Sequence, residues 1–340
     1  MHYLTEKFSI ILLTYSVFLL PINIGGISIY NYVIFLCILL NISKFLFLLR
    51  KFIVWSGLLI SSLLFTAVGS IDYSLHLQGA IAFILTLAGI ALFVNLGTSL
   101  KHRMFVARVF SIYVIGLFIM VAIEMLGVAT IYYAGGERFG IYRPFLFANP
   151  IAISTSLIGA LLSLKTSYFI KFIGFIKLAI FASFTSILMF ILTRSLLLKF
   201  VSFICILFLT MFFVEPENIG SFSIRFLLLG FAIQALTDLD LYGLFFGVGI
   251  RNLDKFNSIY GQLTLINDIT FYMKVLFESG LFGVALLLYR VCRMPFLYSG
   301  LLTFLFFTSV DQHFYFWSLG FLLVGLNINA AQSHRSDRDV

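Results

Sequence analysis

Long apolar runs recur from one end of the chain to the other, and they constrain the fold more than any other feature. The clearest runs cover residues 8–20, 52–68, 77–96, 105–127 and 266–289. About 20 apolar residues in a helix match the hydrocarbon core of a bilayer, where each backbone polar group must be paired within the protein. The pattern therefore predicts an all-α protein, a polytopic bundle of transmembrane helices.

Composition excludes an ordinary soluble protein. The chain is 61% hydrophobic and 11% charged, whereas soluble domains carry about 25% charged residues. Helices consume most of the 340 residues, so we expect one membrane domain over residues 1–340. The three cysteines are widely spaced and the histidines form no metal-ligand pair, so we expect no metal and no cofactor.

The positive charge is explained by membrane orientation. The net charge is +8, and the basic residues gather in alternate connections, near 44–51, 101–108, 165–177, 290–293 and 335–338. The positive-inside rule places these connections in the cytoplasm, which makes a nucleic-acid partner unnecessary. Both termini are then cytoplasmic, and two external loops, about 129–149 and 237–266, are expected to carry short helices.

The number of crossings depends on one ambiguous stretch. We expect helices near 8–22, 27–42, 52–68, 77–97, 105–128, 150–164, 176–192, 195–214, 266–289, 296–310 and 314–330, with basic inner connections at 43–51 and 98–104. Charge parity requires one more crossing, which only residues 222–236 can supply. Twelve crossings is the preferred count. Eleven, with 222–236 lying flat on the outer surface and one earlier helix misassigned, is the alternative.

Two arginines stand close together in the first external loop. Arg138 and Arg143 are five residues apart, on the side where basic residues are disfavoured. The planar guanidinium fork fits phosphate oxygens in pairs, which favours a clamp for a lipid-linked phosphate. The alternative is that both side chains reach toward lipid headgroups.

Arg194 and Arg225 are two further candidates. Arg194 lies between two apolar helices, and a charge at membrane depth usually faces a polar cavity or a partner. It could bind substrate, form a structural ion pair or contact headgroups. Arg225 opens the ambiguous stretch 222–236 and could be either an external ligand or an inner anchor.

The second external loop contains a glycine-rich turn followed by an arginine. Gly247 and Gly249 are separated by one residue, and Arg251 follows. Such glycines allow a tight turn or a close approach of the backbone to a ligand. A nucleotide fingerprint is excluded, because the third glycine and the preceding strand are missing.

The last candidates lie near the end of this loop and beyond it. Asn267 and Asp268 stand where the loop meets a helix, and Asp268 could be a general base or a helix cap. Glu278 lies within a membrane helix and needs a partner, for which Lys274, one turn earlier, is the simplest choice. His313 stands near the outer end of the last helix pair, where a lone histidine is more often interfacial than catalytic.

The order of these motifs resembles the O-antigen polymerase and O-antigen ligase superfamily of bacterial inner-membrane glycosyltransferases. The motifs are Arg138-x-Gly140, Asn149-Pro150, Thr193-Arg194-Ser195, Ser223-x-Arg225, Gly247-Val248-Gly249 and Leu276-x-Glu278-x-Gly280. The resemblance covers residues 138–283. It implies transfer of a glycan from undecaprenyl pyrophosphate to an acceptor sugar on the periplasmic face, without a metal.

The resemblance also implies roles for particular residues. Arg138, Arg143, Arg194 and Arg225 match arginines of the family, and Asn267-Asp268 falls near its His-Asn pair. No histidine stands at 267–269, whereas ligases have one there, so the polymerase side is favoured. A protein that regulates chain length is a further partner that the resemblance implies.

Two other functions remain open. A transporter, such as a flippase for lipid-linked sugars, would also need about twelve helices, but its charges should line a central path. An O-antigen ligase is the second alternative. Membrane lipids contact the chain under every hypothesis.

Overall fold

The protein is described as a computed structural model of residues 2–19, 22–24, 27–128, 136–138, 141–143, 150–163, 236–253, 271–293 and 320–328. In these residues the chain is almost entirely helical, which confirms the all-α prediction. The described strands form two short antiparallel pairs, β1 (Asn23–Ile24) with β2 (Ile27–Ser28), and β3 (Gly136–Arg138) with β4 (Ile141–Arg143).

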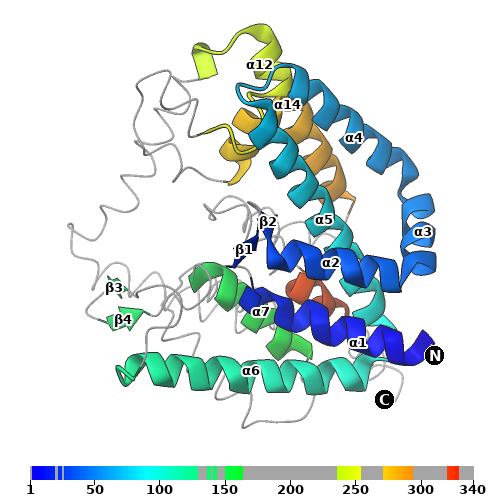
Figure 1. The fold of residues 1–340 in the computed structure, drawn as a ribbon, viewed down its shortest axis with the longest axis vertical. Coiled ribbons are helices and arrows are strands. Elements are labelled where there is room, and N and C mark those ends of the chain that lie inside the picture. Colours follow the sequence, from blue (N-terminus) through cyan, green and yellow to red (C-terminus); the bar gives the residue numbers. More distant parts are fainter. Residues whose placement is uncertain are drawn as a thin grey trace, which may run out of the picture. The chain divides into compact units, whose positions relative to one another are not determined.

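The helices follow the apolar runs of the sequence (Figure 1). They are α1 (His2–Tyr15), the 3-10 helix η1 (Ser16–Leu19), α2 (Ile29–Leu40), α3 (Ile42–Lys51), α4 (Ile53–Val68), α5 (Tyr73–Thr98), α6 (Arg103–Met125), α7 (Pro150–Ser163), α12 (Leu241–Phe246) and α14 (Phe271–Cys292). Residues 320–328 form a further helical segment. Within the described ranges, α5, α6 and Met273–Cys292 of α14 are long and apolar enough to cross a membrane, and the bent pair α2–α3 would add a fourth span. The lengths and compositions of these helices indicate a helical membrane protein.

One expectation for the connections was wrong. Residues 43–51 were expected to be a basic connection, but 42–51 form α3, bent by 92° from α2. The apolar residues of this segment follow helical spacing, so its basic residues form part of a helix. In the first external loop, which was expected to carry short helices, the six described residues form the hairpin β3–β4, and the rest of the loop lies outside the described residues. The second external loop does carry a short helix, α12.

Several predicted elements lie outside the described residues. These are the helices near 176–192, 195–214, 222–236 and 296–310. The choice between eleven and twelve crossings therefore stays a prediction.

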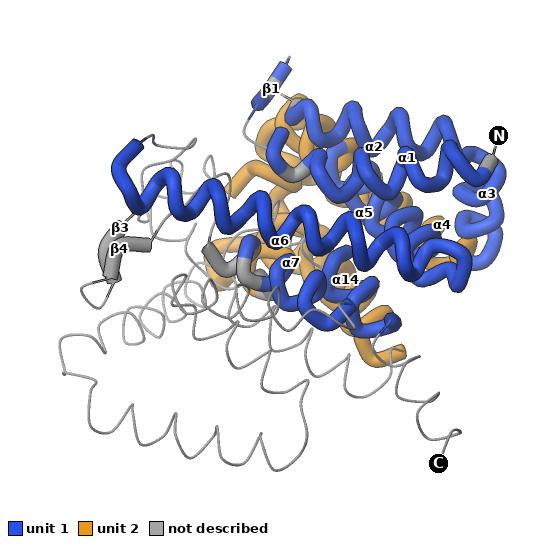
Figure 2. The backbone as a smooth tube through the Cα atoms, turned by 90° about the horizontal axis from the view of Figure 1, so that it is seen from below, with its two compact units in different colours: residues 1–51, 82–187, 312–340 blue, residues 52–81, 188–311 orange. Residues whose placement is uncertain are grey.

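The chain divides into two compact units (Figure 2). Unit 1 comprises residues 1–51, 82–187 and 312–340, and unit 2 comprises residues 52–81 and 188–311. The prediction of one membrane domain remains a prediction. Each unit has its own set of packed helices.

An aromatic cluster forms the core of unit 1. The ring of Phe321 packs against those of Phe110 and Tyr113, with centroids 4.7 and 5.0 Å away, and Phe93 packs against Phe321 as well. The hydroxyl of Tyr113 is 2.8 Å from that of Ser156 on α7. The Ser156 hydroxyl also donates to the Ile153 carbonyl over 2.7 Å, so it accepts from Tyr113, and the contact between the two helices is a hydrogen bond between buried polar groups. The cluster joins α5, α6, α7 and the segment 320–328.

In unit 2, α14 packs against both α4 and α12. The Arg290 guanidinium lies 4.5 Å above the centre of the Phe52 ring, next to the first turn of α4. Toward the other end of α4, the Thr66 hydroxyl donates to the Phe246 carbonyl over 2.7 Å. The start of α4 therefore meets the end of α14. These two helices lie antiparallel, as the predicted directions of their crossings require.

Candidate functional site

Two segments that the charge pattern predicts outside the membrane meet in unit 2. One is the connection between α4 and α5, and the other is the turn at residues 247–252. The Ile71 amide donates to the Val248 carbonyl over 3.1 Å. The Asn252 side chain donates to the Asp72 carbonyl, also over 3.1 Å. The glycine-rich turn is therefore fixed to the end of the α4–α5 pair.

The same turn fills a break in α14. Gly280 has φ 66° and ψ −172°, so the helix is interrupted there. In an unbroken helix the carbonyls of the preceding turn accept from amides four residues later. Here the Phe277 and Glu278 carbonyls accept from the amides of Val248 and Gly249, over 2.8 and 3.2 Å. The break and the turn complete each other's backbone hydrogen bonds.

The Glu278 carboxylate orders the turn around Arg251. The side chain of Glu278 is 2% exposed, and its Oε1 accepts from the Arg251 amide over 3.1 Å. The sequence suggested Lys274 as its partner, and the structure provides this amide instead. Arg251 has φ 62°, a left-handed conformation that costs about 1–2 kcal/mol for residues other than glycine. A charge-assisted hydrogen bond to its amide offsets that cost.

Arg251 presents an exposed guanidinium at the tip of this turn. Its residue is exposed, and within the described residues its side chain forms no ion pair. A guanidinium held on an ordered backbone can bind an anion without first ordering its own attachment point. The described part of the site could therefore bind phosphate oxygens through Arg251.

His76 fixes the turn from the other side. It is buried at the start of α5, where Nδ1 accepts from the Ile250 amide over 3.0 Å and Nε2 lies 3.1 Å from the Leu63 carbonyl. An amide can only donate, so Nδ1 carries no proton, and Nε2–H donates to Leu63. His76 is thus held as a neutral ring. The sequence gave no sign of this role, because Ile250 is 174 residues away along the chain.

Asp72 immediately precedes α5 and caps the helical turn that contains His76. Its Oδ1 accepts from the amides of Ser74 and Leu75 over 2.8 and 3.1 Å. An aspartate in this position satisfies amides that the first helical turn leaves unpaired. The cap and the His76 bonds together hold one wall of the site rigid.

Four predicted site residues come together here: Gly247, Gly249, Arg251 and Glu278. Arg138 and Arg143 belong to unit 1, on strands β3 and β4. In the register of this hairpin, Arg138 pairs with Ile141 and Gly136 with Arg143. Paired residues and residues two apart share a face of a two-stranded sheet, so positions 138 and 143 lie on the same face. The other predicted site residues fall outside the described part of the chain: Arg194, Arg225, Asn267, Asp268 and His313.

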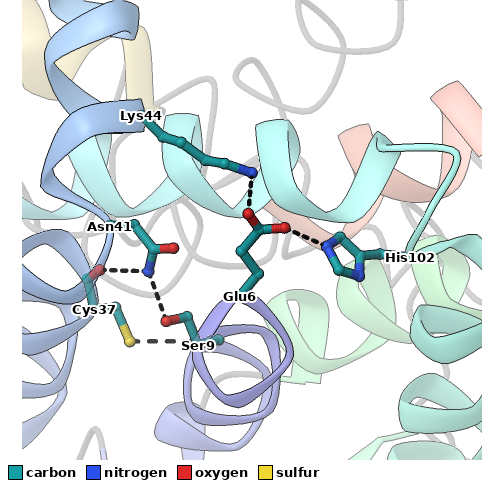
Figure 3. Close-up of polar contacts among 6 residues, drawn as sticks. All are labelled: Glu6, Ser9, Cys37, Asn41, Lys44 and His102. Atoms are coloured by element: carbon teal, nitrogen blue, oxygen red, sulfur yellow. Dashed lines mark hydrogen bonds and ion pairs between the residues drawn. The ribbon is translucent and has the colours of Figure 1, made fainter. Parts of the chain in front are cut away.

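A separate polar cluster lies in unit 1 (Figure 3). The Glu6 carboxylate is 2.8 Å from Lys44 Nζ and 2.6 Å from Nε2 of the buried His102. Burial alone would raise the pKa of Glu6, but the hydrogen bonds and charges of Lys44 and His102 outweigh it and hold that pKa below its ordinary value. The three residues come from segments that the charge pattern predicts on the inner side. They are far from any predicted substrate residue in sequence.

The described residues contain no group of three or more His, Cys, Asp or Glu side chains that could hold a metal ion. No protein-family model matches the chain, and comparison with curated proteins and with solved structures finds no match. The resemblance to the O-antigen polymerase and ligase superfamily therefore rests on the order of the motifs in the sequence alone.

Proposed function

We propose that the chain is an O-antigen polymerase, which joins oligosaccharide repeat units carried on undecaprenyl pyrophosphate. The observation that supports this most is a direct contact between two motifs of the resemblance, the glycine turn and the segment around Glu278. The glycine turn at 247–249 closes the helix break beside Glu278, and their contact orders Arg251. An ordered, exposed guanidinium suits a diphosphate substrate.

The proposed chemistry is a single displacement at the anomeric carbon of the donor sugar. The sugar C–O bond to pyrophosphate breaks while the acceptor hydroxyl oxygen forms the new bond, so the anomeric centre inverts. Pyrophosphate leaves as an anion and needs no proton. What requires stabilisation is the negative charge that grows on its oxygens.

Each residue has a distinct proposed role in this step. Arg138, Arg143 and Arg194 bind the pyrophosphate oxygens. Asp268 accepts the proton of the acceptor hydroxyl as general base. Arg251 adds a further guanidinium for the donor phosphates, and its ordered turn gives it a fixed attachment point.

The proposed setting is the bacterial inner membrane, with twelve crossings and both termini in the cytoplasm. Within each unit, segments predicted on the same side of the membrane contact one another. In unit 1, Glu6, Lys44 and His102 join three predicted inner segments. In unit 2, the contact between Ile71 and Val248 joins two predicted outer segments. Donor lipid would reach the enzyme from the outer leaflet.

The break in α14 also brings a transporter into consideration, because transporters often bind ions at unwound helices. Such sites use backbone carbonyls that the unwinding has freed. In this chain the Phe277 and Glu278 carbonyls already accept from Val248 and Gly249. The break therefore supports the polymerase proposal better than ion coordination.

Arginine substitutions test the proposal. Arg194→Ala and Arg251→Ala are compared with Arg293→Ala, which removes an exposed guanidinium that stacks on Tyr289 at the predicted inner end of α14. Losing one fixed donor to a developing charge slows catalysis by about 100- to 1000-fold. We expect both site variants to lose polymer on a lipopolysaccharide gel and the control to keep it.

Protein abundance in the membrane is measured in parallel, because a misfolded variant would also lose polymer. Arg251→Lys keeps the charge but lacks the planar fork, so it should recover only part of the activity. Normal polymer from Arg194→Ala and Arg251→Ala, at normal abundance, would remove both residues from the proposed reaction.

A further inference from the structure

One face of α5 contacts both the backbone and the side chains of the residue 247–252 turn. His76 and Gly79 are three residues apart on α5, so they lie on the same face of the helix. His76 Nδ1 accepts from the Ile250 amide over 3.0 Å, which fixes the backbone of the turn just before Arg251. Gly79 is buried against the side chains of the same two turn residues. We call His76 and Gly79 the α5 seat.

Gly79 leaves room for the aliphatic stem of Arg251. A Cβ at position 79 would lie 2.9 Å from Arg251 Cγ and 3.1 Å from its Cδ, and 2.7 Å from Ile250 Cγ2. Carbon atoms pack best at about 3.5–4.0 Å, so alanine at this position would displace the side chains of the turn. The glycine therefore lets the stem of Arg251 lie against α5, and the stem sets where the exposed guanidinium begins.

We infer that His76 and Gly79 are positioning residues for Arg251, and that the α5 seat holds the turn only while His76 is neutral. A proton on Nδ1 directs an N–H group at the Ile250 amide, which can only donate, so acid releases the turn. Nε2 cannot replace Nδ1 as the acceptor, because it lies 3.1 Å from the Leu63 carbonyl on α4. The positioning role rests on the proposed function, in which Arg251 binds donor phosphates, but the release by acid does not.

Other charged groups of the described residues lie close to the seat. Asp72 caps α5 one turn before His76, and the Glu278 carboxylate on α14 accepts from the Arg251 amide over 3.1 Å. α4 contributes no charged residue between 53 and 68. Both carboxylates also take up protons in acid, so sensitivity to acid does not by itself identify the histidine. Variants that keep each hydrogen bond but cannot titrate separate the three groups.

Amide hydrogen exchange at Ile250, on the full chain in detergent micelles, measures the release directly. His76→Asn keeps an acceptor, Oδ1, near the position of Nδ1, and it cannot be protonated. His76→Gln carries its amide near the position of Nε2 and leaves the Ile250 amide without an acceptor, which should speed exchange by about 5- to 150-fold. The variants are compared at the same pH, because the intrinsic exchange rate itself varies with pH.

The comparison runs from about pH 8 to about pH 4, which spans the ordinary histidine pKa of about 6.5. At the upper end we expect wild type to match His76→Asn. At the lower end wild type should approach His76→Gln, while His76→Asn keeps its protection. Wild type that stays as protected as His76→Asn throughout, or release that persists in His76→Asn, would overturn the inference.

Two carboxylate variants control for the other titrating groups. Glu278→Gln keeps an oxygen acceptor for the Arg251 amide, and Asp72→Asn keeps an oxygen acceptor for the α5 cap, but neither side chain takes up a proton in this range. We expect both variants to retain the release seen in wild type. Loss of the release in either one would assign it to that carboxylate and contradict the role of His76.

The positioning role is tested through polymer formation in isolated membranes that contain equal amounts of each protein. Gly79→Ala is matched by Gly57→Ala on α4, where an added Cβ meets no atom within 4 Å. A misplacement of about 1 Å can slow an enzyme by about 100-fold, so we expect Gly79→Ala to be about 10- to 100-fold slower than Gly57→Ala. His76→Asn should keep its activity in acid where wild type loses it.

These results separate the inference from the proposed function. Equal rates in Gly79→Ala and Gly57→Ala, or equal loss of activity in acid by wild type and His76→Asn, would remove the positioning role. Absence of polymer from every chain, wild type included, would refute the proposed function. The exchange of the Ile250 amide would still decide whether acid releases the turn.

Discussion

Replacing Gly280 by alanine should destabilise the helix break and release the turn that is bonded across it. The conformation at this residue, φ 66° and ψ −172°, is almost exclusive to glycine and costs other residues about 1–3 kcal/mol. A Cβ at this position would also overlap the Phe245 carbonyl and the Phe246 amide nitrogen, which are backbone atoms that cannot rotate away. Overpacking of this kind costs about 1–3 kcal/mol. Together the two effects destabilise the break by about 2–6 kcal/mol.

Hydrogen exchange at the turn reports this loss directly, because the amides of Val248 and Gly249 are bonded across the break. A cost of 2 kcal/mol corresponds to an increase of about 30-fold in local opening. We expect the peptide covering 247–253 to exchange at least that much faster in Gly280→Ala, with loss of polymer in cells.

Gly57 provides the matched control on α4 of the same unit. No atom lies within 4 Å of a Cβ built there, so Gly57→Ala should stabilise the helix by about 0.5–1 kcal/mol. Exchange at 247–253 should not change in this variant. Equal exchange in Gly280→Ala and Gly57→Ala would refute the assignment of the break as a rigid part of the site.

Two further perturbations test the polar contacts of each unit. His76→Leu leaves the Ile250 amide without its acceptor, which should destabilise unit 2 by about 1–3 kcal/mol and speed exchange at that amide; unchanged exchange would contradict the neutral-ring assignment. Since the folded-state pKa of Glu6 is lowered, its stabilising effect should be present above the ordinary glutamate pKa of about 4.3 and disappear as the pH falls through the lower folded value. Thermal unfolding temperatures of wild type and Glu6→Gln should therefore differ at pH 6, and the difference should shrink as the pH falls below the ordinary glutamate pKa; a constant gap would refute the ion-pair explanation.

The apolar runs predicted most helices because burial in a bilayer depends on local composition. The predicted crossings at 52–68 and 105–128 correspond to α4 and α6 within a few residues. The prediction failed where charge and apolar spacing conflicted. Residues 43–51 contain basic side chains that suggested a connection, yet the apolar residues among them follow helical spacing and form α3.

The candidate site could be predicted only in part. Gly247, Gly249, Arg251 and Glu278 were identified as unusual residues for a membrane-facing segment, and they do come together. Their partners were not predictable, because the bonds join distant positions. Glu278 and Arg251 are 27 residues apart, and His76 and Ile250 are 174 apart. No local pattern encodes such contacts, since they depend on how α4, α5 and α14 pack.

The lipopolysaccharide ladder of a strain that lacks this chain tests the proposed function most directly. A missing polymerase should leave single repeat units attached to lipid A core, because export and ligation still operate. Complete absence of repeat units would indicate a flippase, and long polymer retained on the undecaprenyl carrier would indicate a ligase. An unchanged ladder, or either of those two patterns, would contradict the account given for the residue 247–252 turn and its arginine.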